Sequence, residues 1–348
     1  MRWANLAAPP AEGAPERAAP ATPPLPLALP GATVRTFDTP GFAGMTFYEV
    51  QAKSIINRVP SASRVPFEWT INPYRGCSHA CVYCFARNTH TYLDLDAGAD
   101  FDQKVIVKIN AGELVRRELA APRWRGAHIA MGTNVDCYQR AEGRYQLMPQ
   151  IIAALRDFAN PFSILTKGTL LLRDLPLLRQ AAEVTRVGIS YSVGFVDERL
   201  WRAVEPGTPS PRRRLDAVRR LTDAGFSVGV LMAPILPGLS DDDESIDATV
   251  AAVAAAGATS ISAIPLHLRP GAREWYANWL AREFPHLVPR YRELYRAGSY
   301  APQAYQRELT ARVRIASRRH GLHRGERGEN RDLPEPPSPP AAEQLTLL

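Results

Sequence analysis

The sequence predicts an α/β fold built from parallel strand–helix units. Short apolar runs with strand character alternate with longer amphipathic segments between residues 128 and 265. Gly225 and Gly257 each follow a segment of helical pattern, at the place where glycine commonly ends a helix. The pattern alone is compatible with a partial barrel, a full eight-stranded barrel or a doubly wound sheet.

The 348 residues are expected to form one main domain between two disordered tails. Residues 1–44 are rich in proline and alanine and poor in aromatic residues, so they cannot bury enough apolar surface to fold. Proline returns in residues 331–348, which we interpret in the same way. The main domain is therefore expected over residues 45–270, followed by a helical extension over residues 271–330.

The first part of the domain is expected to lead into the sheet. Residues 45–66 contain short extended pieces, and residues 67–71 alternate in the manner of a first barrel strand. A helix is predicted over residues 82–92, a strand over 100–108 and an amphipathic helix over 111–121.

The regular alternation that follows supplies the other strands and helices. Strands are predicted at 128–131, 162–166, 187–193, 227–233 and 259–265. The helices between them are predicted at 144–159, 174–182, 211–225 and 243–257. A last helix over residues 302–319 ends before Gly321, and its final turns carry a basic group of residues: Arg312, Arg314, Arg318, Arg319 and His320.

The formal net charge of +7 is compatible with an acidic partner such as nucleic acid. Lysine supplies only four of the 42 basic residues, however, and alanine and proline are abundant. This composition points to GC-rich coding rather than to selection for phosphate binding. No segment has the pattern of a signal peptide or the apolar length of a membrane span, so a cytoplasmic protein is expected.

Three of the four cysteines, Cys77, Cys81 and Cys84, lie in one short stretch with the spacing C-x3-C-x2-C. Deprotonated sulfurs this close repel one another unless a metal neutralises them. A structural zinc site would need a fourth nearby ligand, and the sequence offers no second knuckle of cysteine or histidine pairs. Three ligands therefore favour a [4Fe–4S] cluster with one iron left open for a small molecule.

The cysteine motif resembles the signature of the radical S-adenosylmethionine (SAM) enzymes, with Tyr83 as the aromatic residue before the last cysteine. The flanking sequences Asn72–Cys77 and Tyr83–Arg87 are similar to those of the branch related to spore photoproduct lyase, a DNA repair enzyme. The resemblance covers roughly residues 66–270 and implies a partial (β/α)6 barrel of the radical SAM type.

Membership of that family would imply that Cys77, Cys81 and Cys84 ligate a [4Fe–4S] cluster and that SAM chelates the open iron. In the family, the reduced cluster breaks a carbon–sulfur bond of SAM, and the resulting 5′-deoxyadenosyl radical takes a hydrogen atom from the substrate. A reductant such as flavodoxin or ferredoxin would supply the electron.

Polar residues after the predicted strands are the expected contacts to SAM, because ligands bind at the carboxyl ends of parallel strands. The run from Gly132 to Gln139 resembles a family motif, which makes Thr133 and Asn134 the candidates to bind the SAM amino group. A simple polar turn is the alternative. Lys167 is the candidate for the SAM carboxylate, and a structural ion pair is its alternative.

Two further strand ends resemble the family. Ser190 and Ser192 match a Ser-x-Ser pair and could bind the ribose or the carboxylate of SAM, and Tyr83 is counted with them among the cofactor-binding candidates. The pairs Glu205–Pro206 and Arg214–Leu215 also resemble family pairs, without an assigned role.

Cys137 departs from the family pattern, because relatives often have proline at this place. A thiol near the radical could donate a hydrogen atom to a substrate radical, and this makes Cys137 the catalytic candidate. An ordinary buried thiol is the alternative.

The sequence leaves three functions open: a radical SAM enzyme acting on damaged DNA, one acting on a protein, RNA or metabolite, and a non-catalytic iron–sulfur module. DNA is a possible partner of the basic last helix. The final residues Gln344–Leu348 resemble the short motif by which bacterial repair proteins bind the replication sliding clamp, and a chance match is the alternative.

Overall fold

The computed structural model describes residues 3–4, 29–60, 63 and 65–322. The predicted tail over 331–348, with the clamp-like sequence Gln344–Leu348, lies outside the described residues. So does most of the predicted N-terminal arm. From residue 29 onward the structure differs from the predicted disordered arm, because Leu29 is buried and strand β2 (Thr33–Arg35) pairs with strand β3 (Thr46–Ala52).

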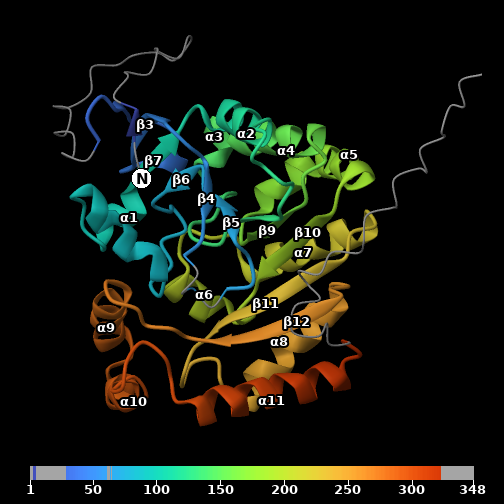
Figure 1. Cartoon of the computed structure of the whole chain (residues 1–348). Coiled ribbons are helices and arrows are strands. Elements are labelled where there is room, and N and C mark those ends of the chain that lie inside the picture. The colour runs from blue at the N-terminus through green and yellow to red at the C-terminus, as the bar shows by residue number, and fades with distance from the viewer. Residues whose placement is uncertain (1–2, 5–28, 61–62, 64, 323–348) are drawn as a thin grey trace, which may run out of the picture.

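Six parallel strands form the main sheet, in the same order as in the sequence (Figure 1). They are β5 (Trp69–Ile71), β8 (Ile129–Met131), β9 (Phe162–Thr166), β10 (Val187–Ser192), β11 (Val228–Ile235) and β12 (Ser260–Pro265). A short strand, β4 (Ile56–Arg58), pairs antiparallel with β5 at one edge. The order runs from β4 to β12 without closing, so the predicted partial (β/α)6 barrel is confirmed.

Helices follow the strands of the main sheet and pack against it (Figure 1). Six of them agree with the predicted segments: α2 (Ala111–Leu119), α4 (Leu147–Asp157), α5 (Leu175–Val184), α7 (Pro211–Asp223), α8 (Asp243–Ala255) and α11 (Gln303–Arg319). Helix α11 packs on α8 and β12. None of the helices in the described part of the chain combines the length and hydrophobicity needed to cross a membrane.

A second, smaller sheet was not predicted. Its path runs β1 (Trp3–Ala4), β3, β7 (Lys104–Lys108) and β6 (Tyr74–Arg75), and β2 also pairs with β3. Strand β6 lies between β5 and the first motif cysteine and pairs antiparallel with β7. The small sheet therefore holds the segment that leads into the cysteine loop (residues 77–84).

Several local predictions were wrong in their details. The segment predicted as a strand over 100–108 begins as helix α1 (Ala99–Gln103) and becomes β7 only afterwards. The helix predicted over 82–92 is a 3-10 helix, η2 (Phe85–Leu93), that begins after the last motif cysteine. The helix predicted over 144–159 is interrupted at Gln146, where φ is 48°, between α3 (Glu142–Tyr145) and α4.

The C-terminal extension covers one side of the cysteine loop. It contains α9 (Ala272–Glu283) and α10 (Val288–Leu294), which were not predicted, as α6 (Glu198–Val204) was not. Buried side chains of α9 and α10 share one hydrophobic cluster with the loop residues Cys81 and Tyr83. The extension is therefore part of the wall of the site rather than a separate appendage.

Gly132 lets two neighbouring strand ends approach closely. It follows β8 with φ 74°, in the left-handed region that favours glycine. A Cβ atom at this position would overlap the carbonyl oxygen of Leu165 on β9. The absence of a side chain at Gly132 therefore allows the loop after β8 to lie against the end of β9.

We expect Gly132→Ala to lower the free energy of unfolding by more than about 3 kcal/mol, because the added methyl group meets backbone that cannot move without disturbing the β8–β9 pair. Gly225→Ala is the matched control: φ is also positive there (93°), but nothing lies within 4 Å of the added atom. The free energy of unfolding of this control variant should fall by only about 1–2 kcal/mol. Urea unfolding measures both, and equal losses would contradict the close approach.

Candidate active site

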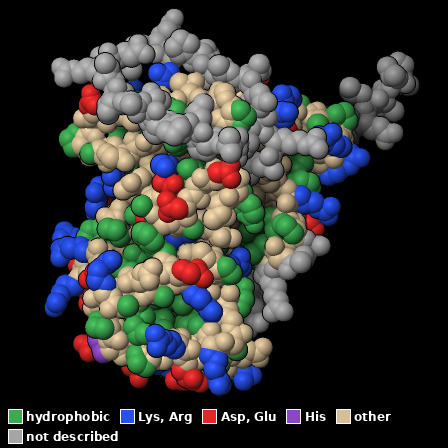
Figure 2. Space-filling view, turned by 90° about the vertical axis from the view of Figure 1, so that its left-hand side faces the viewer, with side chains coloured by type: hydrophobic (Ala, Val, Ile, Leu, Met, Phe, Trp, Pro, Cys, Tyr) green, Lys and Arg blue, Asp and Glu red, His purple; other side chains and the backbone are tan. Residues whose placement is uncertain are grey.

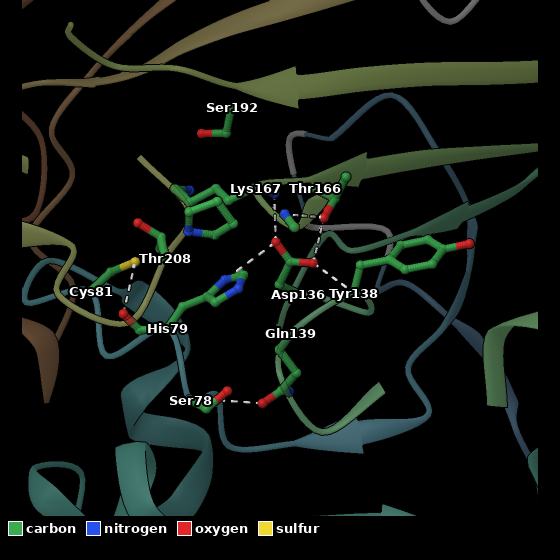
Figure 3. A network of polar contacts seen from close by, with 12 residues as sticks. Ser78, His79, Cys81, Asp136, Tyr138, Gln139, Thr166, Lys167, Ser192 and Thr208 are labelled. Carbon is green, nitrogen blue, oxygen red and sulfur yellow. Dashed lines mark hydrogen bonds and ion pairs between the residues drawn. The ribbon is translucent and has the colours of Figure 1, made fainter. Parts of the chain in front are cut away.

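The cysteine loop lies at the carboxyl ends of the main-sheet strands. The loops after β8 and β9 lie against it, so that Cys81, His79, Asp136 and Lys167 stand near one another (Figure 3). This is the edge of the sheet at which the sequence predicted the site.

The three motif cysteines are sheltered from water. Cys77 and Cys81 are buried, and Cys84 is half-buried. Burial raises the pKa of each thiol, to about 12 for Cys81, and nearby carboxylates and thiols add to the rise at Cys77 and Cys81. The thiols would therefore stay protonated at neutral pH unless a metal centre compensated for the loss of their protons.

The donor set fits an iron–sulfur cluster better than a single metal ion. In the described ranges, no three Cys, His, Asp or Glu side chains are arranged to hold one metal ion. In a [4Fe–4S] cluster each cysteine binds a different iron, so the sulfurs surround the cluster without meeting at one point. Cys81 and Cys84 both add to the raised pKa of the Cys77 thiol, as expected for thiols of one short loop.

Backbone hydrogen bonds fix the cysteine loop to three other parts of the chain. The amide of Cys77 donates to the carbonyl oxygen of Phe101 (2.9 Å), and the amide of Val82 donates to that of Val204 (3.0 Å). The amide of Ser78 donates to Oε1 of Gln139 at 2.9 Å (Figure 3). Each end of the loop thus has a partner on a different element.

Arg87 supports the loop from below. Its side chain is fully buried and donates to the carbonyl oxygen of Cys81 (3.0 Å). Its Nη2 also forms an ion pair with both carboxylate oxygens of Asp102 (2.9 and 3.0 Å). The guanidinium also lies 5.2 Å from the ring centroid of Phe101 and 4.7 Å from that of Trp275. A buried arginine in this position fastens the loop to α1 and to the C-terminal extension.

Asp136 joins the loops after β8 and β9 to the cysteine loop (Figure 3). Its carboxylate accepts hydrogen bonds from Thr166 Oγ1 (2.6 Å), from the amide of Lys167 (2.6 Å) and from the amide of Tyr138 (2.8 Å). Its Oδ2 also lies 3.4 Å from Nδ1 of His79. The carboxylate is thus occupied by protein donors and orients the residues around it.

His79 contributes a neutral imidazole to the site. Burial lowers its pKa to about 4, against the opposing effect of Asp136 and with help from the cations of Lys167 and Arg214. An uncharged ring between Cys77 and Cys81 adds no positive charge of its own to the cysteine loop.

A buried ion pair closes the opposite side of the loop. Tyr83 donates a short hydrogen bond to Glu205, and Arg214 of α7 forms a short ion pair with the same carboxylate. Burial alone would raise the pKa of Glu205, but Arg214 and Lys167 hold it below its ordinary value. Arg214 also donates to Thr208 Oγ1 at 2.6 Å. The hydroxyl of Tyr83, a predicted cofactor contact, is thus used within the protein.

Lys167, Thr133 and Asn134 keep their polar groups available. All three are half-buried, and their side chains form no hydrogen bond or ion pair with the rest of the described chain. The Lys167 ammonium lies 5.8 Å from the ring centroid of Tyr83. Lys167 therefore forms no structural ion pair within the described chain, and its ammonium group faces the cysteine loop.

The two predicted serines differ in availability. Ser190 and Ser192 lie two residues apart on β10 and so share one face of the strand. Ser192 is buried, donates to the carbonyl oxygen of Ala233 (2.9 Å) and stands apart from the Asp136 network in Figure 3. Ser190 is half-buried and forms no side-chain hydrogen bond with the described residues.

Cys137 lies in the main hydrophobic core and is 1% exposed. Burial raises the pKa of its thiol well above the ordinary value, and Asp136 and Glu142 add to the rise. Cys77 makes a smaller contribution that also raises the pKa of the Cys137 thiol. This environment suits a packed thiol beside the cluster loop, and the role of hydrogen donor stays a prediction.

The residues that organise the site were largely missed by the sequence reasoning. Asp136, His79, Gln139 and Arg87 fix the loop, yet no local pattern marks them as a group, because their contacts join distant strand ends. Glu205 had a detectable signal, since both its pair with Pro206 and the Arg214 pair resemble family pairs. Their role, a buried ion pair against Tyr83, became apparent only in the fold.

A model of the radical SAM superfamily matches residues 71–249, which include the cysteine loop and the four barrel strands β8, β9, β10 and β11. The chain belongs to the radical SAM superfamily. It is a radical SAM enzyme, and members of the family carry a [4Fe–4S] cluster and SAM.

Two relatives and one solved structure illustrate the match. An uncharacterized protein of Mycobacterium tuberculosis is 49% identical over 319 residues, 90% of this chain and 92% of its own. One of Methanocaldococcus jannaschii is 29% identical over 203 residues, 58% of this chain and 72% of its own. Spore photoproduct lyase complexed with dinucleoside spore photoproduct has a TM-score of 0.58 at 15% identity, with 79% of both chains covered. This likeness shows a shared fold and agrees with the predicted branch.

Removal of the buried cation should destabilise the radical SAM enzyme strongly. Arg214→Met leaves the Glu205 carboxylate buried without its partner, so the free energy of unfolding should fall by about 3–5 kcal/mol. Arg219→Met is the control on the same helix: its ion pair with Asp216 is exposed (3.5 Å) and should contribute less than about 1 kcal/mol. Chemical denaturation measures both values, and similar small losses would show that the buried pair does not anchor the loop.

Proposed function

We propose that this radical SAM enzyme binds a [4Fe–4S] cluster through Cys77, Cys81 and Cys84, reductively cleaves SAM and abstracts a hydrogen atom from damaged DNA. The observation that carries the proposal is a loop of three sheltered thiols, fixed by hydrogen bonds at the carboxyl ends of the barrel strands. Bound together, the cluster and SAM supply the 5′-deoxyadenosyl radical that removes the hydrogen atom.

The residues around the loop suit the binding of SAM. Lys167 offers an unpaired ammonium that can bind the carboxylate of SAM. Thr133 and Asn134 offer side-chain oxygens that can accept hydrogen bonds from its amino group, and Ser190 offers a free hydroxyl. Ser192 and Tyr83 are weaker candidates, because each already donates to a protein partner.

Support for DNA as the substrate comes from the fold likeness to spore photoproduct lyase, which was solved with a dinucleoside spore photoproduct. The basic end of α11 gives less support. Arg312 pairs with Asp243 (2.7 Å), and Arg319 pairs with Asp247 (2.6 Å), both on α8. His320 also lies 3.1 Å from Asp247. A protein, RNA or metabolite substrate is the alternative, and it would leave the proposed radical chemistry unchanged.

Radical SAM enzymes need a reductant, and we propose a flavodoxin or ferredoxin for this chain. We also propose that Gln344–Leu348 bind the sliding clamp and that the protein is cytoplasmic. A further proposal is the division into a catalytic domain over residues 45–270 and a helical extension over residues 271–330.

Replacement of Cys77, Cys81 or Cys84 by Ala should remove most of the bound iron and all SAM cleavage, because each would ligate a separate iron. Anaerobic reconstitution, iron analysis and chromatographic detection of 5′-deoxyadenosine after reduction provide the measurements. Cys137→Ala is the control for iron content, since Cys137 lies outside the motif. A Cys81→Ala variant with a full cluster and normal SAM cleavage would refute the assignment.

DNA with a base lesion is supplied to the reduced enzyme together with SAM that is deuterated at C5′. Deuterium is expected to pass from SAM into the DNA product.

If Cys137 donates a hydrogen atom to the substrate radical, Cys137→Ala should still cleave SAM but give altered products, because the substrate radical would be quenched by other routes. Mass spectrometry of the DNA measures both effects. An unchanged product distribution would leave Cys137 a packing residue, and deuterium transfer only to a non-DNA substrate would exclude DNA.

A further inference from the structure

Three exposed side chains, Phe85, Arg269 and Tyr300, lie together at the carboxyl end of β12. The Arg269 guanidinium lies 5.4 Å from the ring centroid of Phe85, and its Nη2 is 3.3 Å from the hydroxyl of Tyr300. Phe85 is 42% exposed and Tyr300 is 49% exposed. We call these three residues the aromatic rim.

Backbone and ring contacts hold the aromatic rim in place. His267 forms a β-bridge with Tyr300, and their ring centroids are 4.6 Å apart. The amide of Leu268 donates to the carbonyl oxygen of Ser299 at 2.8 Å. The rings are therefore presented in fixed positions, which limits the entropy lost when a ligand binds.

The aromatic rim lies beside the cysteine loop. Phe85 directly follows Cys84 and begins η2, and α9 packs against η2. Figure 2 views the molecule from the side on which α1, α9 and α10 lie, and hydrophobic side chains appear there among Lys and Arg side chains. A ligand seated on the rim would thus contact the residue that directly follows the last motif cysteine.

Packing within the chain does not account for the aromatic rim. Single exposed rings are common on protein surfaces, and Phe158 at the end of α4 is one, with the same 42% exposure as Phe85. The rim differs because a guanidinium lies against one ring and contacts a second. In the described chain Arg269 has no carboxylate partner, so its charge is available to an anionic ligand.

This combination suits one unit of a single-stranded nucleic acid. Bases stack on aromatic rings and guanidinium planes, and the arginine charge attracts the adjoining phosphate. Bases inside a duplex have both faces covered by their neighbours, so a duplex would have to release a base first.

We propose that Phe85, Arg269 and Tyr300 form a subsite that stacks one unstacked base of a nucleic-acid strand beside the cysteine loop. This inference rests on the proposed function in its choice of substrate class, and it adds the place and the single-stranded state of the bound nucleotide. Phe85 and Tyr300 supply the stacking, and Arg269 supplies the phosphate contact.

The test measures binding of a fluorescein-labelled oligothymidylate of about 12 nucleotides to the reconstituted enzyme by fluorescence anisotropy at several salt concentrations. Phe85→Ala and Tyr300→Ala should each weaken binding about fivefold or more without altering the salt dependence. Arg269→Ala should also weaken binding and should reduce the slope of log K against log salt by about 0.7, the value for one single-strand phosphate. Tyr300→Phe should keep wild-type affinity, because the ring remains.

Matched controls separate stacking from general surface effects. Phe158→Ala removes an equally exposed ring far along the sequence, and Arg296→Ala removes an exposed arginine paired with Glu293 (3.5 Å). Both should bind as the wild type does. Equal affinity for single strand and duplex, wild-type binding by Phe85→Ala and Tyr300→Ala, or displacement of the oligonucleotide by an aromatic peptide at equal concentration would overturn the proposal.

Parallel measurement of SAM cleavage keeps the two proposals distinct. If the enzyme cleaves SAM while the rim variants bind the oligonucleotide normally, the subsite is refuted and the proposed radical chemistry stands. If the rim variants lose binding while the reconstituted enzyme fails to cleave SAM, the subsite is supported and the proposed chemistry is refuted.

Discussion

The desolvation of three thiols in one short loop is the constraint on which the rest of the structure depends. Buried thiols resist deprotonation, and thiolates in close proximity repel one another, so the loop cannot be held by its own cysteines before a metal centre binds. The protein instead holds the loop through its backbone. Three amides of the loop donate hydrogen bonds to acceptors on Phe101, Gln139 and Val204. These acceptors come from three separate parts of the chain.

Two carboxylates, those of Asp136 and Glu205, orient the residues of the site. Asp136 is occupied by donors from the β8 and β9 loops and faces His79, while Glu205 is neutralised by Arg214 and accepts from Tyr83. Both negative charges are thus satisfied within the protein. The Lys167 ammonium has no such partner in the described chain, and this leaves one positive charge facing the cysteines for a bound anion.

Local pattern predicted the six barrel strands and singled out the three motif cysteines as candidate ligands, because apolar periodicity and ligand spacing are properties of neighbouring residues. It could not predict that residues 104–108 leave the barrel for a second sheet, since strand pairing is decided by distant contacts. The same limit applies to Asp136 and Arg87, whose roles arise only when strand ends meet. The helix expected from residue 82 begins at Phe85, because the cysteine loop is held in an irregular conformation by its partners.

These contacts imply that the protein holds the cysteine loop in position before any cluster binds. Hydrogen exchange of the cluster-free protein, followed by mass spectrometry, tests it most directly. We expect the amides of Cys77, Ser78 and Val82 to exchange at least about a hundredfold more slowly than in an unstructured peptide, because each donates to a protein acceptor. Exchange of these amides at the unstructured rate, with protection appearing only after reconstitution, would contradict it.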